Sequence, residues 1–249
     1  MSILHDIVIN TKAKLEKQKL LLPLEDIKSQ LSELNLPKGN FKTSLMNKDQ
    51  AIIAEIKKAS PSAGIIAEDF DPVQKAKEYE EFGAAALSIL TEEDFFLGSI
   101  QYLKDVKAMS TLPILRKDFM VDEYQIYEAK LIGADCILLI ASILSDAEMS
   151  SFVNLAEELQ LDYLIEVHDE HELARVEHFQ NAMIGVNNRN LQTFEVDLQN
   201  SVRLKTLFSQ KNIFVAESGI KNQNDLNYLK KNNINVFLIG ESLMNGDFA

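Results

Sequence analysis

The 249-residue chain is poor in several residue types, and each scarcity narrows what the protein can be. It contains one cysteine and no tryptophan. A single thiol cannot form an intrachain disulfide, which excludes a disulfide-stapled scaffold. No segment has the ~18 consecutive apolar residues of a membrane-spanning helix, and the N-terminal residues MSILHDIVINTKAKLEKQ lack the apolar region of a signal peptide. These absences predict a soluble, cytoplasmic protein with no membrane partner.

Positive charge is also scarce. The 25 lysine and arginine residues are outnumbered by 38 aspartate and glutamate residues, and the formal net charge is -13. No run of Lys or Arg is longer than two residues. Because nucleic-acid-binding surfaces are basic, this composition argues against a nucleic-acid partner. The lone Cys136 lies in the apolar run DCILLIA, which predicts a small buried side chain and not a reactive nucleophile.

Short apolar runs recur along the chain after residue 50. They are rich in Ile, Leu and Val, as in strands buried on both faces, and charged segments with helical spacing separate them. The runs cover residues 51–56, 85–90, 112–116, 135–140, 162–167, 182–187, 213–217 and 234–240. Eight such units predict an α/β protein, a (β/α)₈ TIM barrel. Residues 1–50 are expected to form an N-terminal helical extension and residues 51–249 the barrel, in one domain overall.

Two features qualify this architecture. An open doubly wound sheet is the alternative, but EIKKASPSAG after the first strand is not the glycine-rich fingerprint of that fold. The chain also has only five residues after Met244, which predicts a truncated eighth helix. The outer faces of the first and last strands would then lack their usual cover, with Val236 and Leu238 as candidates for exposure.

Charged residues stand where the predicted strands end. Glu55 and Lys57 are two residues apart and so share one face of the first strand. Lys117 and Glu166 follow two other apolar runs. Catalytic groups of a TIM barrel gather at the carboxyl ends of its strands. Buried together there, these side chains would shift one another's pKa values and suit proton transfer.

Two further patterns concern ligands. The dipeptide SG at 218–219 and the tripeptide GES at 240–242 can offer backbone N–H groups to a phosphate at the ends of the last two strands. The segment HDEH at 168–171 brings two imidazoles near Glu166. His168 is expected at a strand end and His171 at a helix start, without a further ligand cluster, so no metal site is predicted.

These motifs resemble those of one enzyme family. In chain order they are IIAEIKKASPSAG, PILRKDFMVDEYQIYEAKLIGADCILLI, LIEVHDEHEL, IGVNNRNL, VAESGI and FLIGESLM. Together they are similar to indole-3-glycerol phosphate synthases of tryptophan biosynthesis. The resemblance implies ring closure of 1-(2-carboxyphenylamino)-1-deoxyribulose 5-phosphate, with loss of CO₂ and water. It implies a small-molecule substrate and neither a metal nor an organic cofactor. Oligomeric state stays open, with a monomer favoured.

The resemblance also assigns roles. Lys117 would be the acid at the substrate carbonyl, Lys57 would hold the carboxylate and assist the dehydration, and Glu166 would be a base or electrostatic partner. Glu55 and Asn187 would orient this cluster. The expected substrate contacts are Ser60, Pro61, Phe96, Phe119, Arg189 and Glu217. The expected phosphate contacts are Ser218, Gly219, Gly240 and Glu241.

Two further expectations concern the charge of the pocket and one of its loops. Lys57, Lys117, Arg189 and a helix N-terminus are expected to make a positive pocket within the acidic surface. Asn190 stands where the family usually has aspartate, which puts stabilisation of its loop in question.

A phosphoribosylanthranilate isomerase is one alternative, but that enzyme relies on a Cys/Asp pair and no cysteine ends the first strand. A barrel that has lost activity and serves as a scaffold is the other.

Overall fold

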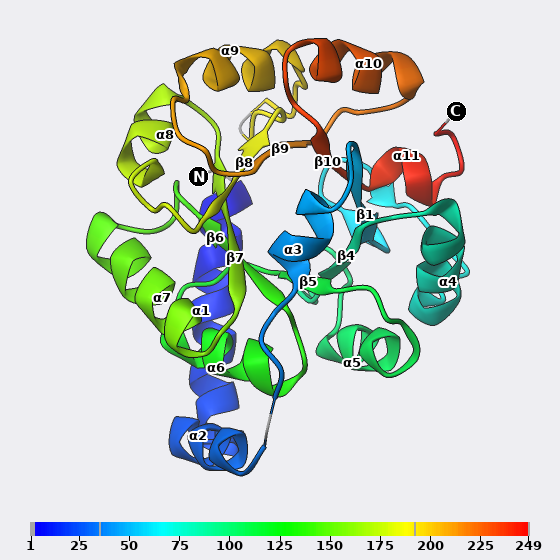
Figure 1. The fold of residues 1–249 in the computed structure, drawn as a ribbon. Coiled ribbons are helices and arrows are strands. Elements are labelled where there is room, and N and C mark those ends of the chain that lie inside the picture. The colour runs from blue at the N-terminus through cyan, green and yellow to red at the C-terminus, as the bar shows by residue number, and fades with distance from the viewer. Residues whose placement is uncertain (1–2, 35, 192, 249) are drawn as a thin grey trace.

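Eight parallel strands close into a barrel in the computed structural model, which describes residues 3–34, 36–191 and 193–248 (Figure 1). Around the barrel the order is β1-β10-β9-β8-β7-β6-β5-β4. The strands are β1 (Ala51–Ile56), β4 (Ala86–Leu90), β5 (Ile114–Lys117), β6 (Cys136–Ile140), β7 (Asp162–Val167), β8 (Met183–Asn187), β9 (Phe214–Glu217) and β10 (Val236–Ile239). The predicted (β/α)₈ TIM barrel is therefore confirmed. A two-stranded hairpin, β2 (Ala59–Ser60) and β3 (Gly64–Ile65), follows β1.

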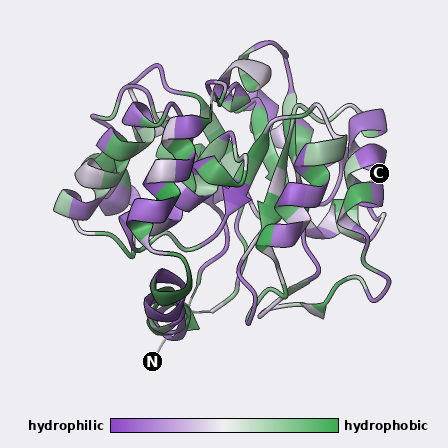
Figure 2. Cartoon of the chain, turned by 90° about the horizontal axis from the view of Figure 1, so that it is seen from below, coloured by the Kyte–Doolittle hydropathy of each residue, from purple (hydrophilic) through white to green (hydrophobic). Residues whose placement is uncertain are grey.

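Helices surround the barrel and turn their apolar faces toward it (Figures 1 and 2). They are α4 (Pro72–Phe82), α5 (Ile100–Met109), α6 (Glu123–Leu131), α7 (Asp146–Glu158), α8 (Glu170–Val176), α9 (Gln199–Leu207), α10 (Gln223–Lys231) and α11 (Glu241–Met244). Helix α4 shows how the sequence sets its limits. Asp71 accepts hydrogen bonds from the amides of Val73 and Gln74, and Gly83 ends the helix at φ 88°.

The barrel interior is filled by side chains that alternate with those facing the helices. Ile53, Leu164 and Leu238 belong to the inner cluster, and so does Cys136, which is fully buried. Burial raises the pKa of the Cys136 thiol, as expected for an inert apolar side chain. This apolar layer lies directly beneath the carboxyl ends of the strands and gives them a floor of low polarity.

The first fifty residues form three helices that lie on different faces of the barrel. They are α1 (Ile3–Leu21), α2 (Leu24–Glu33) and α3 (Phe41–Met46). Helix α3 closes the amino-terminal end of the barrel, where Phe41 and Leu45 join the inner cluster. Helix α1 lies on the opposite side from α3 (Figure 1). Leu15 of α1 and Ile27 of α2 pack with Tyr124 on α6.

The end of the chain is short but covers the barrel wall. Helix α11 has four residues. The expected exposure was wrong for Leu238, which is 5% exposed and points into the barrel, while Val236 is partly buried. The outward-facing Phe237 and Ile239 are buried in the outer cluster, to which Leu243 and Met244 also belong. Phe248 packs against the same cluster, so residues after α11 also cover this wall.

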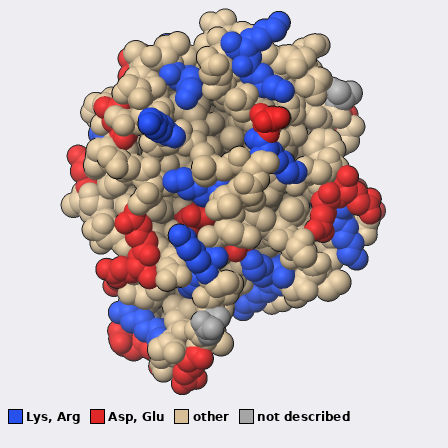
Figure 3. All heavy atoms as spheres, viewed as in Figure 1, with Lys and Arg blue, Asp and Glu red and all other residues tan. Residues whose placement is uncertain are grey.

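The surface carries both signs of charge. On the face seen in Figure 3, lysine and arginine side chains are interspersed with acidic ones. Among the described residues, no helix is long and apolar enough to cross a membrane.

The packing of α3 gives a test of the barrel's lower closure. Phe41 is fully buried, whereas Met46 on the same helix is 67% exposed. Phe41→Ala should lower the free energy of unfolding by about 3–5 kcal/mol through the cavity it leaves. The control Met46→Ala should change it by less than about 0.5 kcal/mol. Equal effects in urea denaturation would show that α3 does not close the core.

Candidate active site

A cavity of about 660 Å³ opens at the carboxyl ends of the strands. All the residues that the sequence nominated as catalytic, substrate-binding or phosphate-binding line it. They are Glu55, Lys57, Ser60, Pro61, Phe96, Lys117, Phe119, Glu166, Asn187, Arg189, Glu217, Ser218, Gly219, Gly240 and Glu241. These residues are scattered over 187 positions of the chain, and the closed barrel brings their side chains to one place.

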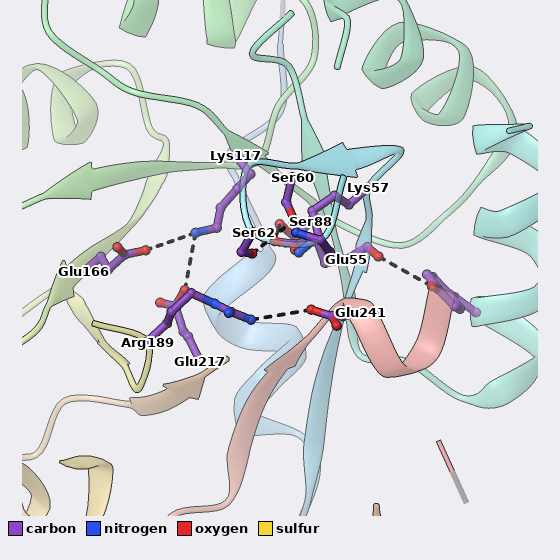
Figure 4. A network of polar contacts seen from close by, with 12 residues as sticks. Glu55, Lys57, Ser60, Ser62, Ser88, Lys117, Glu166, Arg189, Glu217 and Glu241 are labelled. Atoms are coloured by element: carbon purple, nitrogen blue, oxygen red, sulfur yellow. Dashed lines mark hydrogen bonds and ion pairs between the residues drawn. The ribbon is translucent and has the colours of Figure 1, made fainter. Parts of the chain in front are cut away.

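Lys117 occupies the centre of the polar network. Its Nζ lies 3.0 Å from Glu166 Oε2 and 3.4 Å from Glu217 Oε2 (Figure 4). The three residues come from β5, β7 and β9, so the ammonium group spans the mouth of the barrel. Asn187 on β8 donates from Nδ2 to Glu166 Oε1 at 3.1 Å. Glu166 is thereby held from two sides.

Burial and neighbouring charges shift the pKa values of Lys117 and Glu166 in opposite directions. Burial alone would lower the pKa of Lys117, but the carboxylates of Glu166, Glu217 and Glu55 outweigh it and raise that pKa. Burial disfavours ionised Glu166, yet the charge of Lys117 and contacts from His168 and Asn187 hold its pKa well below the usual range. Two like carboxylates beside one cation cannot both be fully stabilised.

Among the carboxyl groups of the cluster, Glu217 keeps its proton most readily. Burial, together with the charges of Glu166 and Glu55, raises its pKa to about 7, although Lys117 opposes the shift. Its Oε1 is buried without a hydrogen-bond partner among the described residues. Glu217 is thus the group of this site that changes charge near neutral pH.

A second cation sits at the end of β1. Lys57 Nζ lies 2.7 Å from Glu55 Oε1, so the two side chains do share one face, as their spacing predicted. Both side chains are largely buried, at 15% and 6% exposure. Ser60 ends β2 and Pro61 begins the turn to β3, and both residues line the cavity wall.

Aromatic side chains form another part of the wall. The rings of Phe96 and Phe119 lie with centroids 5.9 Å apart and planes at 39°. Their loops are fixed by buried carboxylates that accept backbone hydrogen bonds. Glu92 accepts from the amides of Phe95 and Phe96, and Asp118 accepts from the amide of Phe119. These phenyl rings are held ready for a flat apolar group.

The ends of β9 and β10 bring backbone close to the cavity. Ser218 and Gly219 both have left-handed backbone, with φ 67° and 80°. A Cβ on Gly219 would lie 2.1 Å from Val196 Cγ1, and one on Gly240 would lie 2.6 Å from Glu55 Oε1. Glycine is therefore required at position 219 by its left-handed backbone and by Val196, whereas a side chain at position 240 would displace the carboxylate of Glu55.

The expectation of a positive pocket was wrong. The cationic side chains that line the cavity are Lys57, Lys117, Arg189 and Lys221. The carboxyl side chains that line it are Glu55, Asp118, Glu166, Glu217, Glu241 and Asp247. Arg189 itself lies 3.5 Å from Glu241 (Figure 4). Three of these cations, Lys57, Lys117 and Arg189, are paired with carboxylates, so binding of an anion must rest on individual pairs and backbone N–H groups.

Two other expectations concern His168 and Asn190. His168 follows β7 and contacts Glu166 and Glu172. Within the described ranges, no group of three or more His, Cys, Asp or Glu side chains could hold a metal ion. Asn190 keeps its loop in order, because its Oδ1 accepts from the amide of Thr193 at 3.1 Å and its amide donates to the carbonyl of Glu195.

The chain is similar in sequence to proteins of one enzyme family. The family model described as "Indole-3-glycerol phosphate synthase" matches residues 4–248. Two curated relatives with that name are from Clostridium acetobutylicum, at 49% identity, and Lachnoclostridium phytofermentans, at 46%. Each alignment covers 97% of this chain, with 92% and 94% of the relative.

The chain belongs to the indole-3-glycerol phosphate synthase family.

Solved structures show the same fold at much lower sequence identity. The N-acetylmannosamine-6-phosphate 2-epimerase of Clostridium perfringens aligns with a TM-score of 0.59 at 13% identity, over 81% of this chain and 91% of that one. A chain of the tryptophan synthase complex of Pyrococcus furiosus aligns with a TM-score of 0.59 at 16% identity, over 79% and 89%. At these identities the likeness concerns the barrel fold alone.

The structure adds cavity residues that neither the motifs nor the family resemblance nominated. Ile3, Leu4 and Ile7 of α1 line the cavity, together with Phe194 and Val196 of the loop after β8. The sequence predicts helices over residues 1–50, and a helix with apolar residues needs a partner to pack against. That prediction did not show that the partner would be the mouth of the barrel.

Glu217 provides a test of the electrostatics. A raised carboxyl pKa stabilises the fold fully below the unfolded pKa, and this contribution is lost as pH rises through about 7. Glu217→Gln removes the group that must ionise, so it should become more stable relative to the parent between pH 5 and pH 8, by on the order of 1–3 kcal/mol. The control is Glu241→Gln, whose carboxylate at the same mouth is 48% exposed. Urea denaturation at both pH values measures the difference, and a Glu217→Gln curve parallel to the parent would contradict the assignment.

Proposed function

We propose that the chain catalyses the reaction of its family, the conversion of 1-(2-carboxyphenylamino)-1-deoxyribulose 5-phosphate to indole-3-glycerol phosphate. One observation carries the proposal beyond family membership. The ammonium group of Lys117 sits between two carboxylates in a cavity that has phenyl rings on one wall and glycine backbone on another. A substrate with an aromatic ring, a carbonyl and a phosphate could place these groups at the phenyl rings, the ammonium and the glycine backbone, respectively.

The chemistry needs a cation at the substrate carbonyl. Attack by the aromatic carbon makes the carbonyl oxygen negative, and a preorganised ammonium stabilises that charge. Lys117 holds its proton firmly in the free protein because its pKa is raised. It therefore acts first as a cation, and it gives up the proton once the oxygen has become an alkoxide, a stronger base than the amine.

The later steps remove CO₂ and water. The substrate carboxylate leaves as neutral CO₂, so each turnover takes up a proton. Lys57 is suited to hold that carboxylate before it leaves and to protonate the departing hydroxyl, since it lies in the cavity with only Glu55 as its close partner in the described chain. Glu166 is the base or the electrostatic partner of the developing cation, and Glu55 and Asn187 orient these groups.

The remaining residues bind the two ends of the substrate. Phe96 and Phe119 pack against the anthranilate ring, near Ser60 and Pro61. Arg189 and Glu217 are further substrate contacts. The phosphate accepts hydrogen bonds at Ser218, Gly219, Gly240 and Glu241, where backbone amides and not a basic patch supply the attraction.

Assembly and location are further expectations. The chain is expected to act as a monomer in the cytoplasm. Its single buried cysteine fits a reducing compartment. Light scattering on the purified chain measures the mass in solution, and a stable dimer would overturn the first expectation.

Lys117 offers the sharpest test of the proposed reaction. The parent chain should form indole-3-glycerol phosphate, detected by its indole absorbance. Lys117→Met keeps the length of the stem but removes the charge and the proton, and should lower kcat by about 10²–10⁴-fold. Lys104→Met, an exposed position on α5, is the matched control and should leave kcat unchanged. Parental kcat in folded Lys117→Met would refute the role of Lys117, and no product from the parent would refute the function.

A further inference from the structure

Glu166 has a partner behind it that the proposed reaction does not use. The imidazole of His168 lies just past the end of β7, with Nε2 3.4 Å from Glu166 Oε1. That Nε2 is buried and makes no hydrogen bond of good geometry with a described residue, so the contact is that of an ion pair. Lys117 contacts Oε2 of Glu166, and Asn187 and His168 both contact its Oε1.

His168 is itself held by a second carboxylate. Glu172 Oε2 lies 3.1 Å from His168 Nδ1 and also accepts the backbone amide of His168 at 2.7 Å. Glu172 belongs to the first turn of α8, where the N-cap Asp169 accepts its amide at 2.8 Å. Asn200 Nδ2 donates to the carbonyl of His168 at 2.9 Å. The position of the imidazole is thus fixed by both its backbone and its ring.

Two neighbouring cavities are lined by members of the row Glu172, His168, Glu166. Glu166 lines the main cavity. His168 and Glu172 line a neighbouring cavity of about 530 Å³. The charged groups around that second cavity are Asp169, Arg189, Glu195, Asp197 and Arg203, besides Glu172 and His168. The groups that face Glu166 are Lys117, His168, Glu217 and Glu55.

The charges around His168 favour its protonated form, the imidazolium. Burial would lower the pKa of His168, but the neighbouring carboxylates of Glu166 and Glu172 outweigh it and raise the pKa to about 10. A cation flanked by two carboxylates keeps both of them ionised. An imidazolium in turn keeps its own proton through the neutral range.

We propose that His168 is a positioning residue of the active site: held as a cation by Glu172, it fixes the carboxylate of Glu166 in place and in its ionised form. This inference rests on the proposed function for its kinetic consequence. The ion-pair row itself is a property of the free protein and can be tested without substrate.

The kinetic test replaces the imidazole by a neutral amide. His168→Gln should lower kcat about tenfold, because Glu166 loses one of its fixed partners, while KM changes less than about twofold. The acid limb of the kcat profile should also move to higher pH, since loss of a neighbouring cation raises the pKa of the carboxyl cluster. The control is His171→Gln, an exposed histidine on α8, which should change neither quantity.

The substrate-free test is an NMR titration of the histidines. The chain has 4 histidines, so the signal of His168 is identified by its loss in His168→Gln. It should remain that of an imidazolium from pH 5 to above pH 8, whereas a histidine of ordinary pKa titrates near 6.5. In Glu172→Gln the pKa of His168 should fall by at least about one unit.

The outcomes separate this inference from the proposed function. A His168 signal that titrates near pH 6.5 in the parent would overturn the cationic row whatever the enzyme does. Parental kcat and acid limb in folded His168→Gln, with an active parent chain, would overturn the positioning role and leave the function intact. An inactive parent chain with a persistent imidazolium would refute the function and retain the ion-pair row.

Discussion

The burial of one ammonium group between carboxylates from separate strands is the constraint on which the site depends. An unpaired charge inside a protein is very costly, so Lys117 can be buried only if Glu166 and Glu217 reach it. Those carboxylates come from β7 and β9, and only a closed barrel fixes their distance. The fold also makes room for them, since a Cβ on Gly185 would lie 2.0 Å from Glu217 Oε1.

The surroundings of this network strengthen it. Beneath it lies the apolar interior of the barrel, with Leu138 and Ile140 lining the cavity floor. Above it, apolar residues of α1 contribute to the wall. Charges act more strongly on one another where water is scarce. The same surroundings disfavour excess charge, which explains why Glu217 has a pKa near neutrality while Glu166 stays ionised.

Much of the fold followed from local pattern. Buried strands of a parallel barrel are short apolar runs, and a polar residue directly after such a run must lie at the mouth. Lys117 and Glu166 were found in this way, and the family motifs added Phe119 and Arg189. Residues such as Leu238 were misjudged, because a continuous apolar run does not reveal which side chains face inward. The strand register decides that, and it is a property of the whole sheet.

Contacts between residues far apart in the chain could not be predicted from local sequence patterns. Leu4 and Ile7 belong to the predicted N-terminal helical extension, but the sequence showed no partner for them. His168 was considered as a metal ligand, since its spacing to His171 is visible in the sequence while its contact with Glu166 is not. The positive pocket was expected from a count of cations near the mouth. The carboxylates that pair with them lie on other strands, such as Glu217 on β9, and the pairing becomes evident only once the barrel is closed.

The charge state of Lys117 is the central claim, and ¹⁵N NMR of the lysine side chains measures it directly. The Lys117 ammonium is assigned by its absence in a variant that lacks this residue. In the free protein the signal should remain that of a charged ammonium beyond pH 10.5, because the carboxylates around it raise its pKa above the ordinary lysine value of 10.5. Loss of the proton below pH 10.5, the direction in which burial shifts a lysine without such partners, would contradict the account.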